Sequence, residues 1–353
     1  MKKLIALLLA ALLILSLCAC ADNGPKDTAA PTETEAATDA PDTPADTTAP
    51  ATETNEPEPV DLNVYSLKGP TSMGLVTLLQ DSEAGKTFNR YHSTMCTGAD
   101  EVTAALVNGD ADIALLPANA AAALFNKAGG FSVVAINTLG VLYIVENGDT
   151  VQSVADLAGK TVCLTGKGTT PEYSLRFLLN KAGIEDQVNL EFKSEASEVV
   201  AAMSEDVALI GLLPQPFVTA AMMQNENLHI ALDLNSEWAS AAEGSAMVTG
   251  VTVVRNEILE KYPENVKRFL QEAAEGVDAV NSDPAAAAEL IANMGIVAKA
   301  PIAAKALPFC NLVCITGEGM KEQLSGYLQT LFDQNPKAVG GAMPADEFYY
   351  TGE

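Results

Sequence analysis

Three short loops in this chain combine glycine with hydroxyl or amide side chains directly before a predicted helix. They occupy residues 68–73, 117–119 and 166–173. The N–H groups in the first turn of a helix have no partner within the helix, so such a loop can hold an anionic or hydrogen-bond-accepting group. The chemistry that these residue types allow is the non-covalent binding of a small polar molecule.

Individual residues in these loops are candidates for ligand contact. Glycine lets a ligand approach the backbone closely, and hydroxyl and amide groups supply hydrogen bonds. A purely structural role is the alternative, because Ser, Thr and Asn also cap helices at such positions. Pro171 suits a first helical turn and makes 166–173 the strongest of the three loops. The predicted ligand contacts in the loops are Gly69, Thr71, Ser72, Asn119, Gly168, Thr169 and Thr170.

The chain lacks the residue patterns that catalysis or metal binding would need. His92 and His229 are its only histidines, and no motif brings them together. The sequence contains neither Gly-x-Ser-x-Gly nor a phosphate-binding Walker loop. The Gly-x-Gly-x-x-Pro pattern at 166–171 lacks the third glycine of a dinucleotide fingerprint. We therefore expect no catalytic residue, no metal and no cofactor.

Four cysteines follow residue 20, and their spacing does not indicate a zinc site. Cys96, Cys163, Cys310 and Cys314 form no Cys-x-x-Cys pair. The last two would share one face of a helix if their segment is helical. The two cysteines could form a disulfide or could be two small buried thiols. We expect them to be buried thiols.

The acidic composition argues against nucleic acid as a partner. The 353 residues include 20 Lys and Arg and 46 Asp and Glu, so the formal net charge is −26. Such a charge repels a phosphate backbone. The chain has four arginines, which are Arg90, Arg176, Arg255 and Arg268. None of them lies in the three loops, where an arginine could bind a sulfonate or phosphate group through two hydrogen bonds. We expect a neutral or weakly anionic organic ligand.

The first 60 residues have the composition of an export signal and a tether. Two lysines precede an apolar stretch at 5–17, and small Ala19 stands before Cys20, as in a lipobox. The apolar stretch is too short to span a bilayer. We expect a signal peptide at 1–19, lipidation of Cys20 with palmitate, and a disordered acidic tether rich in Thr, Pro and Ala at 20–60.

The remaining residues alternate short apolar runs with helix-like stretches, which indicates an α/β fold. The predicted elements include helices at 71–79 and 99–108 and a strand at 189–192. One series of strand, loop and helix ends near Asn147, and a second series lasts until a β-rich run begins at Met247. Two crossovers predict a two-lobed fold with a hinge and an interlobe cleft. The predicted segments are lobe 1 at 61–147, lobe 2 at 148–246, and a return strand with C-terminal helices at 247–353 that complete lobe 1.

Two further polar residues are predicted to face this cleft. Asn137 lies at the first crossover, where its amide can serve a ligand or satisfy hinge backbone. Gln215 lies in a loop between a strand and a helix of the second series. Trp238, the only tryptophan, can stack on a ligand or pack against its own lobe, and packing is the preferred interpretation.

Four short motifs of this chain have an informative order and spacing. They are Gly-Asp-Ala-Asp-Ile-Ala at 109–114, Leu-Ala-Gly-Lys-Thr-Val at 157–162, Gly-Lys-Gly-Thr-Thr-Pro-Glu at 166–172 and Leu-Pro-Gln-Pro-Phe at 213–217. Through these motifs the chain resembles substrate-binding subunits of ABC importers, with the type II periplasmic-binding fold of the nitrate, sulfonate and thiamine-precursor class. The family often has an acidic residue where Gln215 stands, so the resemblance does not imply a cationic ligand.

The resemblance implies an extracytoplasmic protein that captures a small organic solute by lobe closure and delivers it to an ABC-type permease. It further implies a monomer without enzymatic activity, held at the outer face of the cell membrane by its lipid anchor. Two alternatives remain open. One is an enzyme on the two-lobed fold, although the lipobox argues against a cofactor-dependent cytosolic enzyme. The other is a solute receptor for a membrane sensor, whose sequence would show the same pattern.

Overall fold

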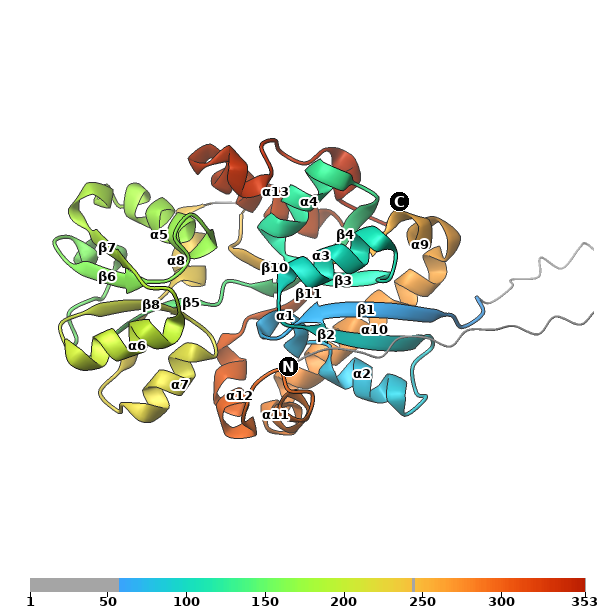
Figure 1. Ribbon diagram of the computed structural model, residues 1–353, viewed down its shortest axis with the longest axis horizontal. Coiled ribbons are helices and arrows are strands. Elements are labelled where there is room, and N and C mark those ends of the chain that lie inside the picture. The colour runs from blue at the N-terminus through green and yellow to red at the C-terminus, as the bar shows by residue number, and fades with distance from the viewer. Residues whose placement is uncertain (1–56, 243–244, 353) are drawn as a thin grey trace, which may run out of the picture. The chain divides into compact units, whose positions relative to one another are not determined.

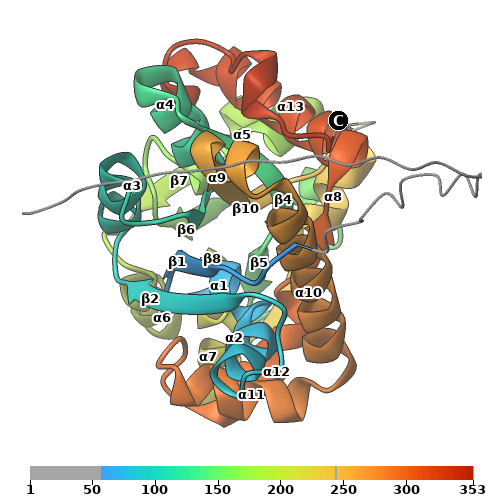
Figure 2. The same ribbon diagram turned by 90° about the vertical axis from the view of Figure 1, so that its right-hand side faces the viewer.

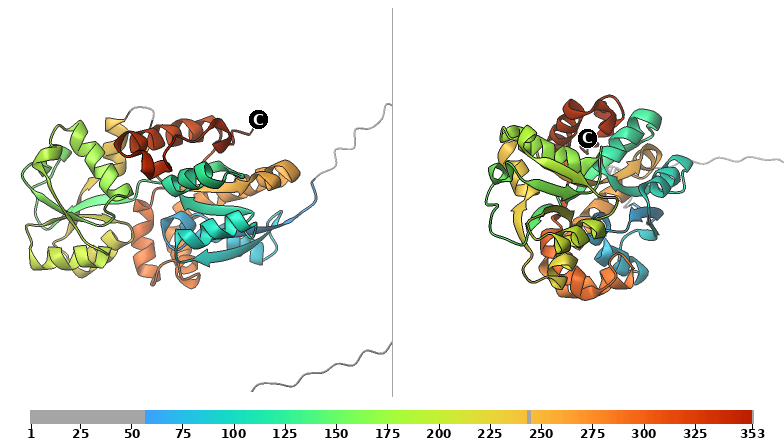
Figure 3. Two further views of the ribbon diagram at one scale, coloured as in Figure 1. Left: turned by 45° about the horizontal axis from the view of Figure 1, so that its top comes forward. Right: turned by 60° about the vertical axis from the view of Figure 1, so that its left-hand side comes forward.

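The computed structural model describes residues 57–242 and 245–352, which belong to one compact unit. Two β-sheets with flanking helices form the framework of this unit (Figures 1, 2 and 3). The predicted signal peptide, the predicted lipidation site Cys20 and most of the predicted tether lie outside the described residues. Among those residues, no helix combines the length and the apolar character that crossing a membrane requires.

Six strands form the first sheet: β1 (Asp61–Leu67), β2 (Arg90–Cys96), β3 (Ile113–Pro117), β4 (Phe131–Leu139), β10 (Val248–Arg255) and β11 (Leu312–Ile315). Their order is β11-β4-β10-β3-β1-β2. β1 pairs in parallel with β2 and β3, whereas β10 lies antiparallel between β3 and β4. β3 and β4 are almost entirely buried because helices cover both faces of the centre of the sheet.

Five strands form the second sheet: β5 (Leu142–Glu146), β6 (Thr161–Leu164), β7 (Asn189–Phe192), β8 (Ile210–Pro214) and β9 (His229–Asp233). Their order is β7-β6-β8-β5-β9. β6 is parallel to β7 and β8, while β5 runs antiparallel to β8 and β9. The two sheets together have the α/β, two-lobed architecture that the alternating pattern predicts.

Thirteen helices of the described residues connect or cover these strands. Those with the first sheet are α1 (Pro70–Met73), α2 (Val76–Glu83), α3 (Ala99–Asn108), α4 (Ala118–Ala128), α9 (Asn256–Lys261), α10 (Pro263–Ser282), α11 (Pro284–Asn293), α12 (Ala300–Ala306) and α13 (Gly317–Gln334). Those with the second sheet are α5 (Thr170–Lys181), α6 (Ala196–Glu205), α7 (Phe217–Gln224) and α8 (Leu234–Ala241). The short 3-10 helices are η1 (Val154–Leu157), η2 (Glu185–Gln187), η3 (Leu307–Phe309), η4 (Pro336–Val339) and η5 (Asp346–Phe348).

The chain passes from the first sheet to the second at Gly140, seven positions before the boundary expected at Asn147. β5 was expected to end lobe 1, but it pairs with β8 and β9 of the second sheet. β4 and β5 are both buried apolar runs, so their sequences do not indicate which sheet each joins. The return passes from α8 to β10, next to the expected position at Met247.

Helix α13 packs on the first sheet and on helix α5 of the second lobe. One core cluster runs from Ile136 of β4 through Leu328 of α13 to Leu164 of β6. Figure 3 shows α13, in red, extending from the first-sheet side toward the green helices of the second. The segment 247–353 therefore supplies β10 and β11 to the first sheet, but its last long helix also contacts lobe 2.

Trp238 lies in this contact and is fully buried, as the packing interpretation predicts. Its ring centroid is 4.3 Å from that of Phe177 on α5 and 5.4 Å from that of Tyr327 on α13. The indole Nε1 donates to Ser245 Oγ at 3.1 Å. The three rings join α5, α8 and α13.

The segment around Cys310 and Cys314 is not helical. Cys310 follows η3 and Cys314 lies in β11. Both thiols are unpaired, so the disulfide alternative does not occur, and Cys310 is fully buried. Burial raises the pKa of Cys310 to about 12 and that of Cys314 to about 11.

Candidate functional site

Four helices begin where strands of the two sheets end. α1 follows β1 and α4 follows β3 in the first sheet, while α5 follows β6 and α7 follows β8 in the second. In open α/β sheets ligands bind at such edges, because the N–H groups of first helical turns gather there. The loops predicted from the sequence all belong to these four connections.

The loop before α1 turns most of its side chains inward. Gly69 has φ 129°, a conformation that favours glycine. Ser72 is buried and its Oγ donates to the carbonyl of Leu67, at the end of β1. Thr71 is also buried, and Lys68 is exposed. The hydroxyl of Ser72 therefore holds the loop together, while the backbone at Gly69 is open to a ligand.

Asn137 and Thr71 converge on Gly250 at the centre of the first sheet. A Cβ atom on Gly250 would lie 2.5 Å from Asn137 Oδ1 and 2.5 Å from Thr71 Cγ2. Asn137 Nδ2 donates to Thr252 Oγ1 at 3.1 Å, and its Oδ1 accepts from Thr138 Oγ1 at 2.9 Å. The structure thus brings together two predicted residues that are 66 positions apart in the sequence, beside a cavity of about 10 Å³.

Asn119 is the second residue of α4 and is half-buried. Its side chain does not cap the helix, because Pro117 occupies the N-cap position and no side-chain cap bond forms there. Within the described residues its amide has no hydrogen bond. Of the predicted contacts on the first sheet, Asn119 is therefore the one whose amide is available.

The loop before α5 is exposed and closes on itself. Thr169 Oγ1 donates to the carbonyl of Gly166 at 2.7 Å, and the N–H of Gly168 donates to Glu172 Oε2 at 2.6 Å. Gly166 and Gly168 both have positive φ, 78° and 73°. Glu172 was not predicted as a site residue, although its place in the first turn of α5 is a recognisable signal for contact with helix N–H groups.

Glu172 gives the N-terminus of α5 a negative charge of its own. Burial raises the pKa of its carboxyl group, but the N–H of Gly168 and the guanidinium of Arg176 outweigh this, so the pKa is lowered overall. Arg176 Nε donates to Glu172 Oε1 at 2.8 Å. An anionic ligand at this loop would have to displace or approach this carboxylate.

Thr170 lies near two buried hydroxyl groups. Tyr327 OH of α13 and Ser174 Oγ of α5 are both buried without a hydrogen-bond partner among the described residues. Burial raises the pKa of Tyr327 to about 12, and the nearby hydroxyls of Thr170 and Ser174 partly oppose the rise. These hydroxyls are close to Tyr327 but not in hydrogen-bonding geometry, so the predicted residue Thr170 adjoins the contact between α5 and α13.

Gln215 is buried, with 2% of its surface exposed. Its Oε1 accepts from Thr219 Oγ1 at 2.8 Å, and its backbone N–H donates to the carbonyl of Val141 beside the crossover. Nε2 has no partner among the described residues. The side chain therefore organises the start of α7, whereas Phe217, two residues later, is 46% exposed.

The four arginines are engaged by other side chains. Arg90 pairs with Asp61, Arg176 with Glu172 and Glu185, and Arg255 with Asp112 and Glu257, while Arg268 lies over the ring of Phe88. His92 and His229 lie apart, beside Asp61 and Glu146 respectively. In the described part of the chain, no cluster of three His, Cys, Asp or Glu side chains could hold a metal ion.

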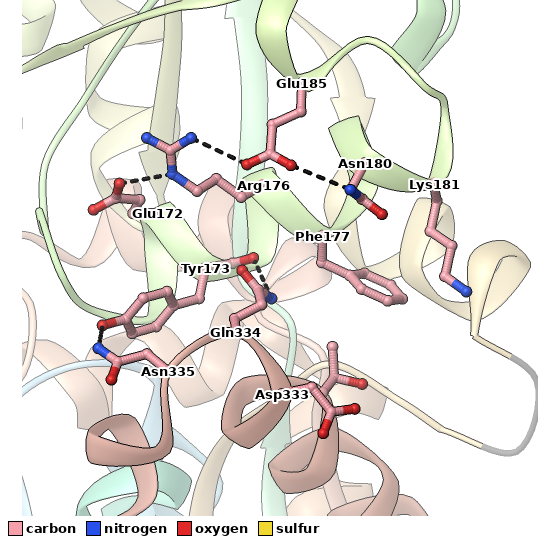
Figure 4. A pocket seen from close by; sticks show the side chains of 11 residues that line it. Glu172, Tyr173, Arg176, Phe177, Asn180, Lys181, Glu185, Asp333, Gln334 and Asn335 are labelled. Carbon is pink, nitrogen blue, oxygen red and sulfur yellow. Dashed lines mark hydrogen bonds and ion pairs between the residues drawn. The ribbon is translucent and has the colours of Figure 1, made fainter.

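A pocket of about 690 Å³ lies between α5 and the end of α13, and the sequence patterns did not indicate it. Figure 4 shows Arg176 between the carboxylates of Glu172 and Glu185 on one wall, with Tyr173 directed toward Asn335. The pocket is lined by Glu172, Tyr173, Arg176, Phe177, Asn180, Lys181, Glu185, Thr330, Asp333, Gln334 and Asn335.

Sequence comparison relates this chain to one protein family. A family model described as NMT1/THI5 like matches residues 94–287, more than half of the chain. A protein of Brucella abortus (strain 2308), which carries a provisional name as a binding protein, is 28% identical over 251 residues. That alignment covers 67% of this chain and 75% of the relative.

Solved structures share the fold at low sequence identity. A structure described as an ABC transporter from Parabacteroides distasonis has a TM-score of 0.68 at 20% identity, covering 82% of this chain and 98% of that one. The periplasmic aliphatic sulphonate binding protein SsuA from Escherichia coli has a TM-score of 0.62 at 18% identity, covering 82% and 94%. A DszB mutant in complex with biphenyl-2-sulfinic acid has a TM-score of 0.57 at 16% identity, covering 82% and 96%.

The matched segment contains the motifs at 109–114, 157–162, 166–172 and 213–217 on which the resemblance was based. The shared fold confirms the two-lobed type II periplasmic-binding architecture. The chain belongs to the NMT1/THI5-like family.

Proposed function

We propose that this chain is an extracytoplasmic solute-binding protein that captures a small organic molecule between its lobes and delivers it to an ABC-type permease. The observation that carries the proposal is the arrangement of α1, α4, α5 and α7, which begin at strand ends of both sheets. Contacts made by both lobes exist only when the lobes are close, so a ligand shifts the hinge equilibrium toward closure. Family membership and the binding-protein name of the Brucella relative support this function.

The proposed ligand contacts fall into two groups. On the first lobe they are the backbone at Gly69, the amide of Asn119, and the Thr71 and Asn137 pair. On the second lobe they are the backbone and hydroxyls of the loop Gly168, Thr169 and Thr170, together with exposed Phe217. Ser72 and Gln215, which bond inward, shape the loops that carry these groups.

The proposed ligand is neutral or weakly anionic and has hydrogen-bond acceptors. Sulfonate-binding proteins share the fold, but no arginine of this chain is free of a carboxylate or aromatic partner. The strongest helix N-terminus already has the carboxylate of Glu172 beside its N–H groups. Amides, hydroxyls and an exposed aromatic ring suit an uncharged organic molecule better than a strong anion.

The proposal includes the predicted lipid anchor on Cys20 and the tether at 20–60, which would keep a monomeric binding domain near its permease. Mass spectrometry of the chain from bacterial membranes tests the anchor, because palmitate and the diacylglyceryl group add a fixed mass to the peptide that begins at Cys20. A Cys20→Ala variant is the control. Recovery of the unmodified peptide from membranes would contradict the anchor and leave the binding function to its own test.

Native mass spectrometry of residues 55–353 tests the binding function. A stoichiometric small molecule, released unchanged on denaturation, is the expected result and identifies the solute class. Incubation with that molecule should then raise the melting temperature in proportion to the logarithm of its concentration. A bound molecule that is chemically altered during incubation would favour the enzyme alternative, and failure of a broad solute panel to shift the melting temperature would contradict the proposal.

A further inference from the structure

Two side-chain amides at the end of α13 bind one residue of α5. Gln334 Nε2 donates to the backbone carbonyl of Tyr173 at 3.0 Å, and Asn335 Nδ2 donates to the Tyr173 hydroxyl at 2.6 Å (Figure 4). Asn335 Oδ1 accepts the N–H of Lys337 at 3.1 Å, so its amide nitrogen is left to face Tyr173. Tyr173 is 8% exposed, and its own N–H donates to Thr169 of the predicted ligand loop.

The helix that supplies these amides is fixed to the first lobe on both sides. α13 follows β11 of the first sheet, and the chain after it, η4, packs on α4. Asn126 Nδ2 donates to the carbonyls of Val339 and Ala342, at 2.8 and 2.7 Å. A Cβ atom on Gly340 would lie 2.7 Å from the Cα of Ala123, which shows how closely the segment approaches α4.

The bonds to Tyr173 therefore connect the lobes away from the crossovers. Tyr173 belongs to α5, which begins directly after the loop at 166–169, and β6 before that loop lies in the second sheet. The bonds border the pocket of about 690 Å³, in which Arg176 pairs with Glu172 and Glu185, while the amides of Gln334 and Asn335 bond to Tyr173. Neutral hydrogen bonds at such a place are weak enough to break and re-form when lobes move.

We propose that Gln334 and Asn335 form an interlobe strap that positions Tyr173, and with it the ligand loop at 166–170, relative to the first lobe. The two hydrogen bonds to Tyr173 stabilise the present distance between the lobes, and they break when that distance changes. The aromatic contact of Trp238 with Tyr327 and Phe177 stays as the pivot, because Trp238 and Tyr327 are buried and the three rings have no polar bond across α5 and α13 to lose. The proposal rests on the proposed function only in assigning the loop to a ligand.

The test is an interlobe distance measured without any ligand. Val107 on the first lobe and Val207 on the second are 56% and 69% exposed, so Val107→Cys and Val207→Cys supply fluorophore sites in the unit 55–353. Tyr173→Phe and Asn335→Ala each remove the same hydrogen bond and should each lower about fivefold the ratio of molecules at the present interlobe distance to molecules at other distances. Gln334→Ala should do so by a similar factor. Gln329→Ala, which removes a bond within α13 to Asp333, is the matched control and should leave the ratio unchanged.

A double variant distinguishes a specific effect of Asn335 on Tyr173 from a general destabilisation of the contact between the lobes. If Asn335 acts through the Tyr173 hydroxyl, Tyr173→Phe with Asn335→Ala should show the same ratio as either single variant. Unchanged distance distributions in the folded single variants, or effects that simply multiply, would overturn the strap. These measurements use no ligand, so their result remains valid if native mass spectrometry finds no solute. Conversely, if the interlobe distances contradict the strap, the discovery of a bound solute would not restore it.

Discussion

The side-chain amide of Asn311 donates to the carbonyl of Gly140 at 2.6 Å, at the point where the chain leaves the first sheet for the second. The N–H of the same glycine donates to Asn235 Oδ1 of α8 at 3.2 Å. Asn311 has φ 46°, a left-handed conformation that Asn tolerates better than most residues. One crossover residue is thus held from both lobes, by side chains 76 positions apart.

Gly140→Ala should destabilise the protein by about 1–3 kcal/mol, because the new methyl group overpacks this crossover. Its Cβ would lie 2.2 Å from Met247 Cε and 2.9 Å from Asn235 Cβ. Urea unfolding followed by circular dichroism measures the change. Gly319→Ala on α13 is the control, since its Cβ would meet only Ile315 at 3.8 Å and a helical alanine should stabilise by about 0.5–1 kcal/mol. Equal stability of Gly140→Ala and the native chain would contradict a tightly packed crossover.

The double variant Thr169→Ala, Thr170→Ala should bind the solute identified by native mass spectrometry more than tenfold more weakly. The double variant removes the hydroxyl that donates to Gly166 and the one beside Tyr327, so the loop loses both ligand groups and internal order. Isothermal titration calorimetry on the folded variant measures the affinity. Thr103→Ala removes a comparable hydroxyl bond to Ala99 on α3 and should leave the affinity unchanged. Native affinity in the double variant would remove this loop from the site.

Glu172→Gln should reduce the dependence of stability on pH in the acid range. Burial raises the Glu172 pKa, but the Gly168 N–H and Arg176 lower it by more, so the folded pKa lies below the unfolded value. The carboxylate therefore stabilises the fold above the unfolded pKa, and this stabilisation is lost as pH falls through the folded pKa. The difference in unfolding free energy between the native chain and the variant should be largest near pH 7 and shrink below about pH 4.5.

Melting temperatures from pH 7 to pH 3 measure this effect. Glu205→Gln, at the exposed end of α6, is the control and should follow the native profile. A constant difference between Glu172→Gln and the native chain across that range would show that the carboxylate does not stabilise the loop through its charge.

Trp238→Ala should destabilise the protein by about 3–5 kcal/mol, because it leaves a large cavity between Phe177 and Tyr327. Chemical denaturation gives the free energy of unfolding, and in the native chain the fluorescence of this single tryptophan should shift to longer wavelength as it is exposed. Met223→Ala on α7, at 44% exposure, should change stability by less than about 0.5 kcal/mol. A small loss for Trp238→Ala would mean that α13 is not joined to lobe 2 through this side chain.

The thiols of Cys96, Cys163, Cys310 and Cys314 should react with a thiol reagent only after unfolding. Burial raises the pKa of all four thiols, to about 12 for Cys310, and Cys96, Cys163 and Cys310 are buried. Ellman's reagent at pH 8 measures the reaction, with the chain in guanidinium chloride as the positive control. Rapid modification of Cys310 in the native protein would indicate that η3 and β11 open readily.

The sequence predicted most elements closely where periodicity and flanking residues agreed. The helix expected at 99–108 and the strand expected at 189–192 have these bounds in the structure. The helix expected at 71–79 is broken into α1 and α2 at Gly74, where α10 approaches so closely that a Cβ would lie 2.9 Å from Val277. Strand β9 and helices α8 and α12 were not predicted as elements, because their patterns are short and depend on burial against distant segments.

Local residue types and their spacing predict the α/β class, the loops that open helices and the family motifs, and they place no arginine clamp in those loops. Tertiary packing determines which sheet β5 joins, where Ser72 and Gln215 point, and that Glu172 accepts the Gly168 N–H. It also brings Asn335, at the end of α13, to Tyr173, which lies 162 positions earlier in the chain. Packing between distant segments sets these features, and no local pattern records it.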